Sequence, residues 1–160
     1  MLELRTEGEF MPRLRTHLQV SVPAGVASGW WFSEGQDPAF RILETAGAGL
    51  GGALGGVLPD CIDLPIHSHH RSGAHGIVPA IGMGAIAFQQ AAGAQDWLRA
   101  QADLHGQARA VATSVVGEIW HLFCEALLRL LAGAVVGLPT GYASHLTLDF
   151  FTPRSLPLVC

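Results

Sequence analysis

Glycines recur at four-residue intervals along an uncharged stretch of this chain, residues 46–58. One row holds Gly47, Gly51 and Gly55, and a neighbouring row holds Gly52 and Gly56. Residues four apart share one face of a helix, so these rows would leave a helix surface almost free of side chains. Small residues at this interval let two helix backbones approach closely, especially in lipid. The stretch therefore predicts a tightly packed helix, although glycine also suits the alternative, a flexible loop.

The charge content limits what can surround such helices. Hydrophobic residues make up 49% of the 160 residues and charged residues 14%, against roughly 25% charged in an ordinary soluble domain. Every basic side chain is arginine, the net charge is -4 and no basic patch stands out, so we expect no nucleic-acid partner. Three cysteines without a Cys-x-x-Cys spacing argue against a disulfide framework and for a reducing compartment.

Three long segments carry little charge, namely 46–58, 76–95 and 111–138. None is an unambiguous transmembrane helix of about 20 apolar residues. The opening residues 1–17 carry several charges and do not form the apolar core of a signal peptide. We therefore expect short, glycine-rich helices lying in or partly through a bilayer, with a soluble helical bundle as the alternative.

No strand-like alternation of useful length occurs, so the sequence predicts an all-α, compact bundle of about five to six short helices. Residues 1–35 read as a variable leader broken by Pro12, Pro23 and nearby glycines, and residues 36–160 as one helical domain. Asp37-Pro38 predicts a helix start, with the aspartate as N-cap, and Pro59 predicts its end. The remaining expected helices are 76–92, 95–109, 111–137, ending at Gly137-Leu138-Pro139, and 140–151.

Histidines and carboxylates gather in two segments about seventy residues apart, 60–75 and 145–149. Imidazole nitrogens and carboxylate oxygens are the ligands that zinc, iron or manganese accept. His145 and Asp149 are four apart, so a helix would aim both side chains at one point. The alternatives are a hydrogen bond within the helix for this pair, and a polar surface loop or an adventitious metal binder for the histidines of 67–75.

The long helix predicted over 111–137 carries a polar stripe of Glu118, His121, Glu125 and Arg129. At about 100° per residue these four fall within an arc of about 80°, while the other faces are apolar. The spacings Glu118-x-x-His121 and His121-x-x-x-Glu125 suit metal ligands. Such groups face either a bundle interior, as in lipid, or solvent, and the sequence leaves both open.

The ordered motifs Leu58-Pro59-Asp60-x-x-Asp63, His70-Arg71-x-x-x-His75 and Ser144-His145-x-x-x-Asp149-x-x-Thr152-Pro153 resemble a small bacterial family. Its members are LexA-regulated, inner-membrane-associated, metal-dependent hydrolases, and the resemblance covers roughly residues 45–158. It implies metal ligands at Asp60, His70, His75, His145 and Asp149, with Asp63 and Arg71 beside them. Departures from the family pattern are Gly76 in place of a serine, the extra His67 and His69, and a chain that ends soon after Asp149.

The resulting hypothesis is a hydrolase at the bacterial inner membrane, using one or more divalent metal ions, with zinc as the first choice. The distant similarity of this family to zinc-dependent phospholipases C and nucleases suggests a small-molecule or lipid phosphoester as substrate. Asp63 or Glu118 would serve as general base and Arg71 would hold the anionic substrate, while His121 is a further candidate ligand. The competing hypothesis is a non-catalytic helical membrane protein whose metal site is structural or sensing. A soluble cytoplasmic protein is the alternative location.

Overall fold

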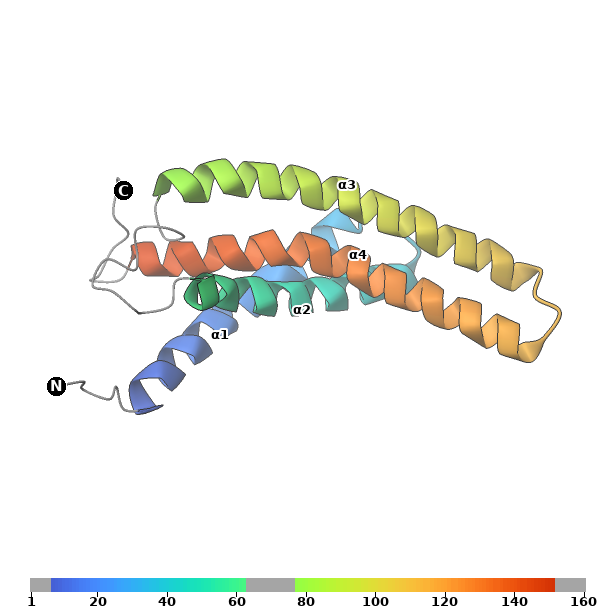
Figure 1. Cartoon of the computed structure of the whole chain (residues 1–160), viewed down its shortest axis with the longest axis horizontal. Helices are drawn as coiled ribbons and strands as arrows, with labels where there is room; N and C mark the ends of the chain where they lie inside the picture. Colours follow the sequence, from blue (N-terminus) through green and yellow to red (C-terminus); the bar gives the residue numbers. More distant parts are fainter. Residues whose placement is uncertain (1–6, 63–76, 152–160) are drawn as a thin grey trace.

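The computed structural model describes residues 7–62 and 77–151. These residues form four helices and no strand: α1 (Glu7–Phe32), α2 (Pro38–Ile62), α3 (Ile77–Ala110) and α4 (Val115–Phe150) (Figure 1). The all-α class is confirmed. The prediction of five to six short helices is wrong for the described residues, because two pairs of predicted helices are each one long helix.

Two helices continue through a residue at which the sequence predicts a break, a glycine in one case and a proline in the other. α3 passes through Gly93, where two helices were expected, and α4 passes through Pro139, where the longest helix was expected to end. One glycine in a helix costs only about 1 kcal/mol relative to alanine, and a proline about 3 kcal/mol. Pro139 is buried between Gly137 and Gly141, which both pack against α2. Tertiary packing therefore offsets the local cost.

Most of the predicted leader is helix α1. It continues through Pro12 and Pro23 without ending, so the expected break in residues 1–35 is wrong for residues 7–32. The helix packs against both α2 and α4. Gly35 lies in the turn that follows, with a φ of 82°, a backbone conformation that favours glycine. The boundary at residue 35 stays a prediction.

The start of α2 is the one that the sequence predicts. Asp37 precedes Pro38, the first helical residue, and its Oδ1 accepts a hydrogen bond from the Ala39 backbone N–H at 2.9 Å. This aspartate satisfies a donor that the first turn of a helix leaves open. At the other end, α2 continues through Pro59 to Ile62, so the predicted end is early.

The glycine rows of α2 pack directly against backbone. A Cβ atom added at Gly51 would collide with the carbonyl oxygen of Ala134 on α4, and one at Gly137 would collide with that of Ala48 on α2. The same holds at the other members of this seam, which we call the glycine seam and which comprises Gly47, Gly51 and Gly55 on α2 with Gly133, Gly137 and Gly141 on α4. The predicted close approach of helices is therefore confirmed, and the flexible-loop alternative is wrong.

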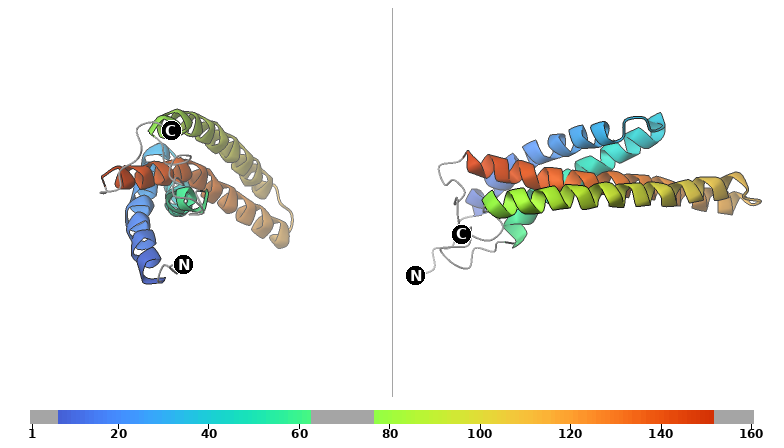
Figure 2. Two further views of the ribbon diagram at one scale, coloured as in Figure 1. Left: turned by 60° about the vertical axis from the view of Figure 1, so that its left-hand side comes forward. Right: turned by 90° about the horizontal axis from the view of Figure 1, so that it is seen from above.

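Helix α1 packs against the second glycine row of α2, which holds Gly52 and Gly56. A Cβ at Gly52 would collide with the carbonyl oxygen of Ser21, and one at Gly25 with that of Ala48. α2 is thus held between α1 and α4 by two faces without bulky side chains, and α4 contacts all three other helices. Figures 1 and 2 show the α3–α4 hairpin extending beyond α1 and α2 at its loop end.

A network of ion pairs joins α2, α3 and α4 at that half of the molecule. The carboxylate of Glu44, which is fully buried, contacts Arg99 at 2.5 Å and Arg129 at 3.2 Å. Arg129 also contacts Asp103 at 2.5 Å. Nearer the hairpin loop, Arg109 lies 3.1 Å from the carboxylate of Glu125, which is 4% exposed. These charges are neutralised by partners inside the fold.

The polar stripe of α4 turns out to face its neighbours. Glu125 and Arg129 are buried, His121 is half-buried, and Glu118 alone of the four is exposed. The interpretation of this stripe as a solvent face is therefore wrong for Glu125 and Arg129, which lie against α3 and α2. The exposed side of the same helix is apolar.

Candidate metal centre

His145 and Asp149 lie one turn apart on α4 and point at the same place. The imidazole Nε2 is 3.5 Å from the Asp149 carboxylate. Both residues are buried, with 0% of His145 and 6% of Asp149 exposed. The convergence that the four-residue spacing predicts is confirmed, and it brings an imidazole and a carboxylate together in a water-poor part of the fold.

Asp60 reaches the same point from α2. Its Oδ1 is 3.7 Å from Nε2 of His145, although the two residues are far apart in sequence. The glycine seam makes this possible, because Gly55 and Gly141 bring the backbones of α2 and α4 into contact just before each side chain. Asp60 is half-buried, so its carboxylate forms the more open side of the cluster.

His17 brings a third helix, α1, to the cluster, and the sequence reasoning missed this residue. Its ring stacks on that of His145, with centroids 3.8 Å apart and planes inclined by 15°. Its Nε2 is 3.7 Å from Asp149 Oδ1, so the Asp149 carboxylate lies close to both imidazoles. His17 falls in the segment that the sequence reasoning set aside as a leader.

One pattern in the sequence would have pointed to His17. It begins a row at four-residue spacing that continues with Ser21, Gly25 and Gly29, and the four residues are buried. Small residues in this row mark the face of α1 that contacts α2. A histidine at the next position of that face is therefore placed beside the end of α2, where Asp60 lies.

The backbone fixes the tautomer of His145. Nδ1 lies 2.6 Å from the carbonyl oxygen of Gly56, and because a carbonyl can only accept, Nδ1 must carry the proton and donate. In the neutral ring this leaves the lone pair on Nε2, the atom that faces Asp60 and Asp149. A backbone carbonyl behind a histidine ring is the usual arrangement for a metal ligand, since it orients the ring and raises its basicity.

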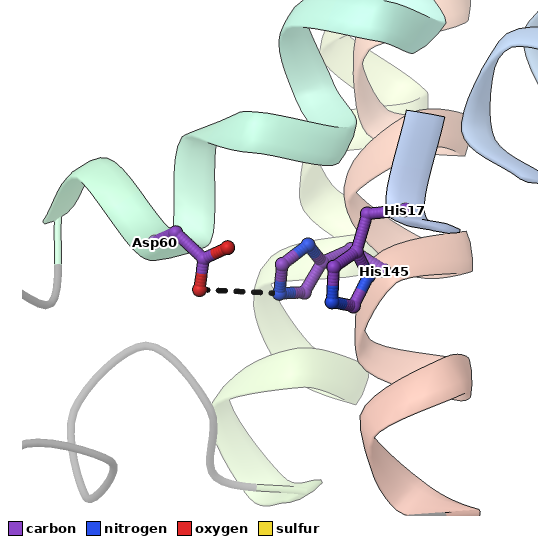
Figure 3. A group of neighbouring side chains, drawn as sticks. All are labelled: His17, Asp60 and His145. Atoms are coloured by element: carbon purple, nitrogen blue, oxygen red, sulfur yellow. Dashed lines mark ion pairs between the residues drawn. The ribbon is translucent and has the colours of Figure 1, made fainter. Parts of the chain in front are cut away.

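Together these side chains offer a compact set of ligand atoms, and Figure 3 shows three of the residues, His17, Asp60 and His145. One atom each from His17, Asp60 and His145 lies within 4.8 Å of the others, and Asp149 borders both histidines. Two imidazoles with carboxylate oxygens are a donor set that suits zinc and other divalent transition metals. The residues therefore fit such an ion.

The other predicted site residues fall into two groups. Asp63, His70, Arg71 and His75 lie outside the described residues. Glu118 and His121 are on α4, but 24 or more residues before His145 correspond to about 36 Å or more along a helix. The expectation that these two share a site with His145 is wrong, because a common helix face says nothing about separation along the axis. His121 contacts His105 of α3 instead.

Comparisons with known proteins identify no relative: no family model, no curated protein and no solved structure matches this chain. The resemblance to the hydrolase family therefore rests on the residues quoted from the sequence.

Proposed function

We propose that this protein is a membrane-associated hydrolase that uses a divalent metal ion to cleave a phosphoester, and zinc is the first candidate for that ion. The observation that carries the proposal is the meeting of His17, Asp60 and His145 from three different helices, with their ligand atoms within 4.8 Å. Asp149 adds a second carboxylate. Two imidazoles and two carboxylates gathered in this way at the end of a helical bundle offer the nitrogen and oxygen atoms that a divalent cation accepts as ligands.

In this proposal His17, Asp60, His145 and Asp149 hold the ion. An ion held there would supply Lewis-acid chemistry and would lower the pKa of a bound water molecule towards about 7. The protein's own part is to orient the ligands and to bind the substrate. Gly56 holds the His145 ring through its carbonyl oxygen, and the half-buried Asp60 leaves one side open.

Residues close to Asp60 in sequence complete the proposed mechanism. Asp63 acts as the general base, Arg71 binds the anionic phosphoester, and His70 and His75 are further ligands. An arginine suits this role because its planar fork donates two parallel hydrogen bonds to a phosphate. Glu118 is no longer a candidate for general base at this site, because it lies at the far end of α4.

The surface of α4 supports the membrane part of the proposal. This helix, within the described residues, is long and apolar enough to cross a membrane. In the first half of α4 the distribution of side chains is the reverse of that in a soluble protein. The polar stripe faces α3 and α2, while large apolar side chains face outwards. At about 100° per residue these exposed side chains cover an arc of about 180°, wider than one partner helix would cover. They are Val115, Val116, Ile119, Trp120, Leu122, Phe123, Leu127 and Leu131.

The outer face of α2 carries a second apolar row, which leads along that helix towards the candidate centre. Ile42, Leu50 and Leu54 are 64%, 57% and 64% exposed, and Leu58 extends the same row to within two residues of Asp60. A row of this kind next to a phosphoester site favours a lipid over a water-soluble substrate. The proposed location is the bacterial inner membrane, with a cytoplasmic protein as the alternative.

Metal analysis combined with an activity screen tests this function. Protein purified in detergent is assayed for bound zinc, iron and manganese, and for hydrolysis of a soluble phosphodiester and of phospholipid in mixed micelles. We expect His17→Ala and His145→Ala each to lose the ion of this centre and turnover together. Thr147→Ala, an exposed position on the same turn of α4, is the control and should retain both. Full turnover in the two histidine variants would refute the proposal.

A structural or sensing metal site is the second candidate, and the complete burial of His145 favours it. An ion at this position would tie α1, α2 and α4 together. Metal removal would then lower the melting temperature by several degrees, while the purified, metal-loaded protein would hydrolyse no phosphoester. Membrane association is tested separately by flotation with phosphatidylcholine vesicles, and recovery of the chain in the aqueous fraction without detergent would contradict it.

A further inference from the structure

A second pair of histidines faces across the α3–α4 hairpin, away from the candidate metal centre. His105 on α3 and His121 on α4 are both half-buried, and their Nδ1 atoms are 3.0 Å apart. The ring centroids are 5.3 Å apart and the planes are inclined by 44°. The two rings thus direct the same kind of nitrogen at a common point without stacking on one another.

This separation matches two ligands of a single transition-metal ion. Zinc binds imidazole nitrogen at about 2.0–2.1 Å, so two such nitrogens lie about 2.9 Å apart at a right angle and about 3.3 Å apart at a tetrahedral angle. The observed 3.0 Å falls between these values. A metal-free pair would share one proton between the two nitrogens instead.

The same part of the hairpin holds a buried carboxylate, that of Glu125. Glu125 follows His121 by one turn of α4 and is 4% exposed. Its Oε1 lies over Gly106, the residue after His105, and a Cβ at Gly106 would be only 2.8 Å from that oxygen. The missing side chain of Gly106 therefore provides the space that the carboxylate occupies. Arg109 lies 3.1 Å from Oε2 of Glu125 and balances its charge.

We propose that His105, His121 and Glu125 form a second metal-binding site, which takes a zinc-like transition-metal ion and clasps α3 to α4. The two imidazoles are the direct ligands, and the ion draws the Glu125 carboxylate away from Arg109 to become the third. Water completes the coordination. The separation from His145 is about 36 Å along α4, so this site is independent of the proposed hydrolase centre.

Zinc binding by matched variants tests the second site. The background is full-length Asp60→Asn/His145→Ala, which disables the first centre, and zinc bound per chain is measured by equilibrium dialysis against Zn²⁺ in detergent. Adding His105→Gln/His121→Gln should lower the bound zinc by one ion per chain. Adding Gln107→Ala, an exposed position on α3, should leave it unchanged. Equal stoichiometry in the two sets would overturn the proposal.

Hydrogen exchange of the unmodified chain gives a readout that does not depend on the variants folding. Zn²⁺ should slow amide exchange in residues 104–125 at least tenfold, because the ion joins both sides of the hairpin. Glu125→Gln should weaken zinc binding by tenfold or more through loss of the third ligand. Unchanged exchange in the hairpin, or zinc affinity unaffected by Glu125→Gln, would contradict this three-ligand site.

Discussion

Two regions of the α4 helix, around Arg129 and around His145, both bury ionisable side chains, but they arrange them in different ways. Around Glu44, carboxylates meet arginines, and each charge has an opposite charge within 3.2 Å. Around His145, imidazoles meet carboxylates at 3.5–3.7 Å. The first arrangement is neutral by itself and holds helices together. The second presents electron-pair donors to a shared point, which is what a cation needs. Burial alone therefore does not distinguish a structural ion-pair network from a candidate metal centre, whereas the type of partner does.

The largest effect should follow from breaking the neutral arrangement. Glu44→Gln leaves Arg99 and Arg129 without their shared carboxylate, and loss of one member of a buried pair costs about 3–5 kcal/mol. Thermal and chemical unfolding in detergent would measure this change. Asp96→Asn is the matched control, because Asp96 contacts the same Arg99 from a side chain that is 77% exposed. If both variants lost equal stability, the network would not be the structural element described here.

A smaller loss of stability is expected at the glycine seam, which lies between these two regions. Gly137→Ala places a methyl group against the Ala48 carbonyl oxygen, so the unfolding free energy should fall by about 1–3 kcal/mol. Gly93→Ala on α3 is the control, since nothing lies within 4 Å of its added Cβ. It should raise stability by up to about 1 kcal/mol through helix propensity. If Gly137→Ala lowers the unfolding free energy and Gly93→Ala raises it, the close packing at the seam is supported. If both variants change the unfolding free energy in the same direction, the description of the seam is contradicted.

The candidate centre should respond in metal affinity more than in stability. Asp60→Asn removes one charged ligand from a half-buried position, so zinc affinity should fall at least about tenfold. The metal-free chain should unfold within about 0.5 kcal/mol of the parent, as expected for a partly exposed carboxylate. Isothermal titration with Zn²⁺ and unfolding in the presence of a chelator measure the two effects. If Asp60→Asn greatly lowered the unfolding free energy of the metal-free chain, Asp60 would have a structural role like that of the residues around Glu44.

The smallest change in stability is expected at Asp96, which lies at the exposed edge of the ion-pair network, whereas Glu44 lies in its interior. Asp96→Asn, the control above, should change the unfolding free energy by about 0–1 kcal/mol, and this contribution should vanish at high salt. The contribution of Glu44, by contrast, should persist in 1 M salt because the pair is buried. Unfolding at two ionic strengths checks both expectations.

Local patterns predicted the parts of this fold that depend on neighbours in sequence. The N-cap at Asp37, the close-packed face with Gly51 and the convergence of His145 with Asp149 all follow from one turn of helix. The number of helices did not follow, because packing on both sides of Pro139 decides whether that proline ends a helix. The partner in that packing is α2, which is far away in the sequence, so the residues around the proline do not reveal it.

Long-range placement explains the errors at the site. His121 shares a helix with His145, and the angular pattern gives its face but not its distance along the axis, so it was assigned to the wrong end. His17 has no ligand-type residue at helical spacing, so no pattern of paired ligands marked it. Its position follows only from the row of small residues that seats α1 on α2.

The glycine seam has a consequence for how this protein can change over evolution. Contact between backbones leaves no rotamers that could absorb an added methyl group, so a substitution at Gly141 would shift α4 as a rigid rod. His145 lies one turn further on and would move with it, away from Asp60. The spacing of the ligand atoms is thus governed by positions that never touch them, and variation at this centre should be most restricted where the chain has no side chains at all.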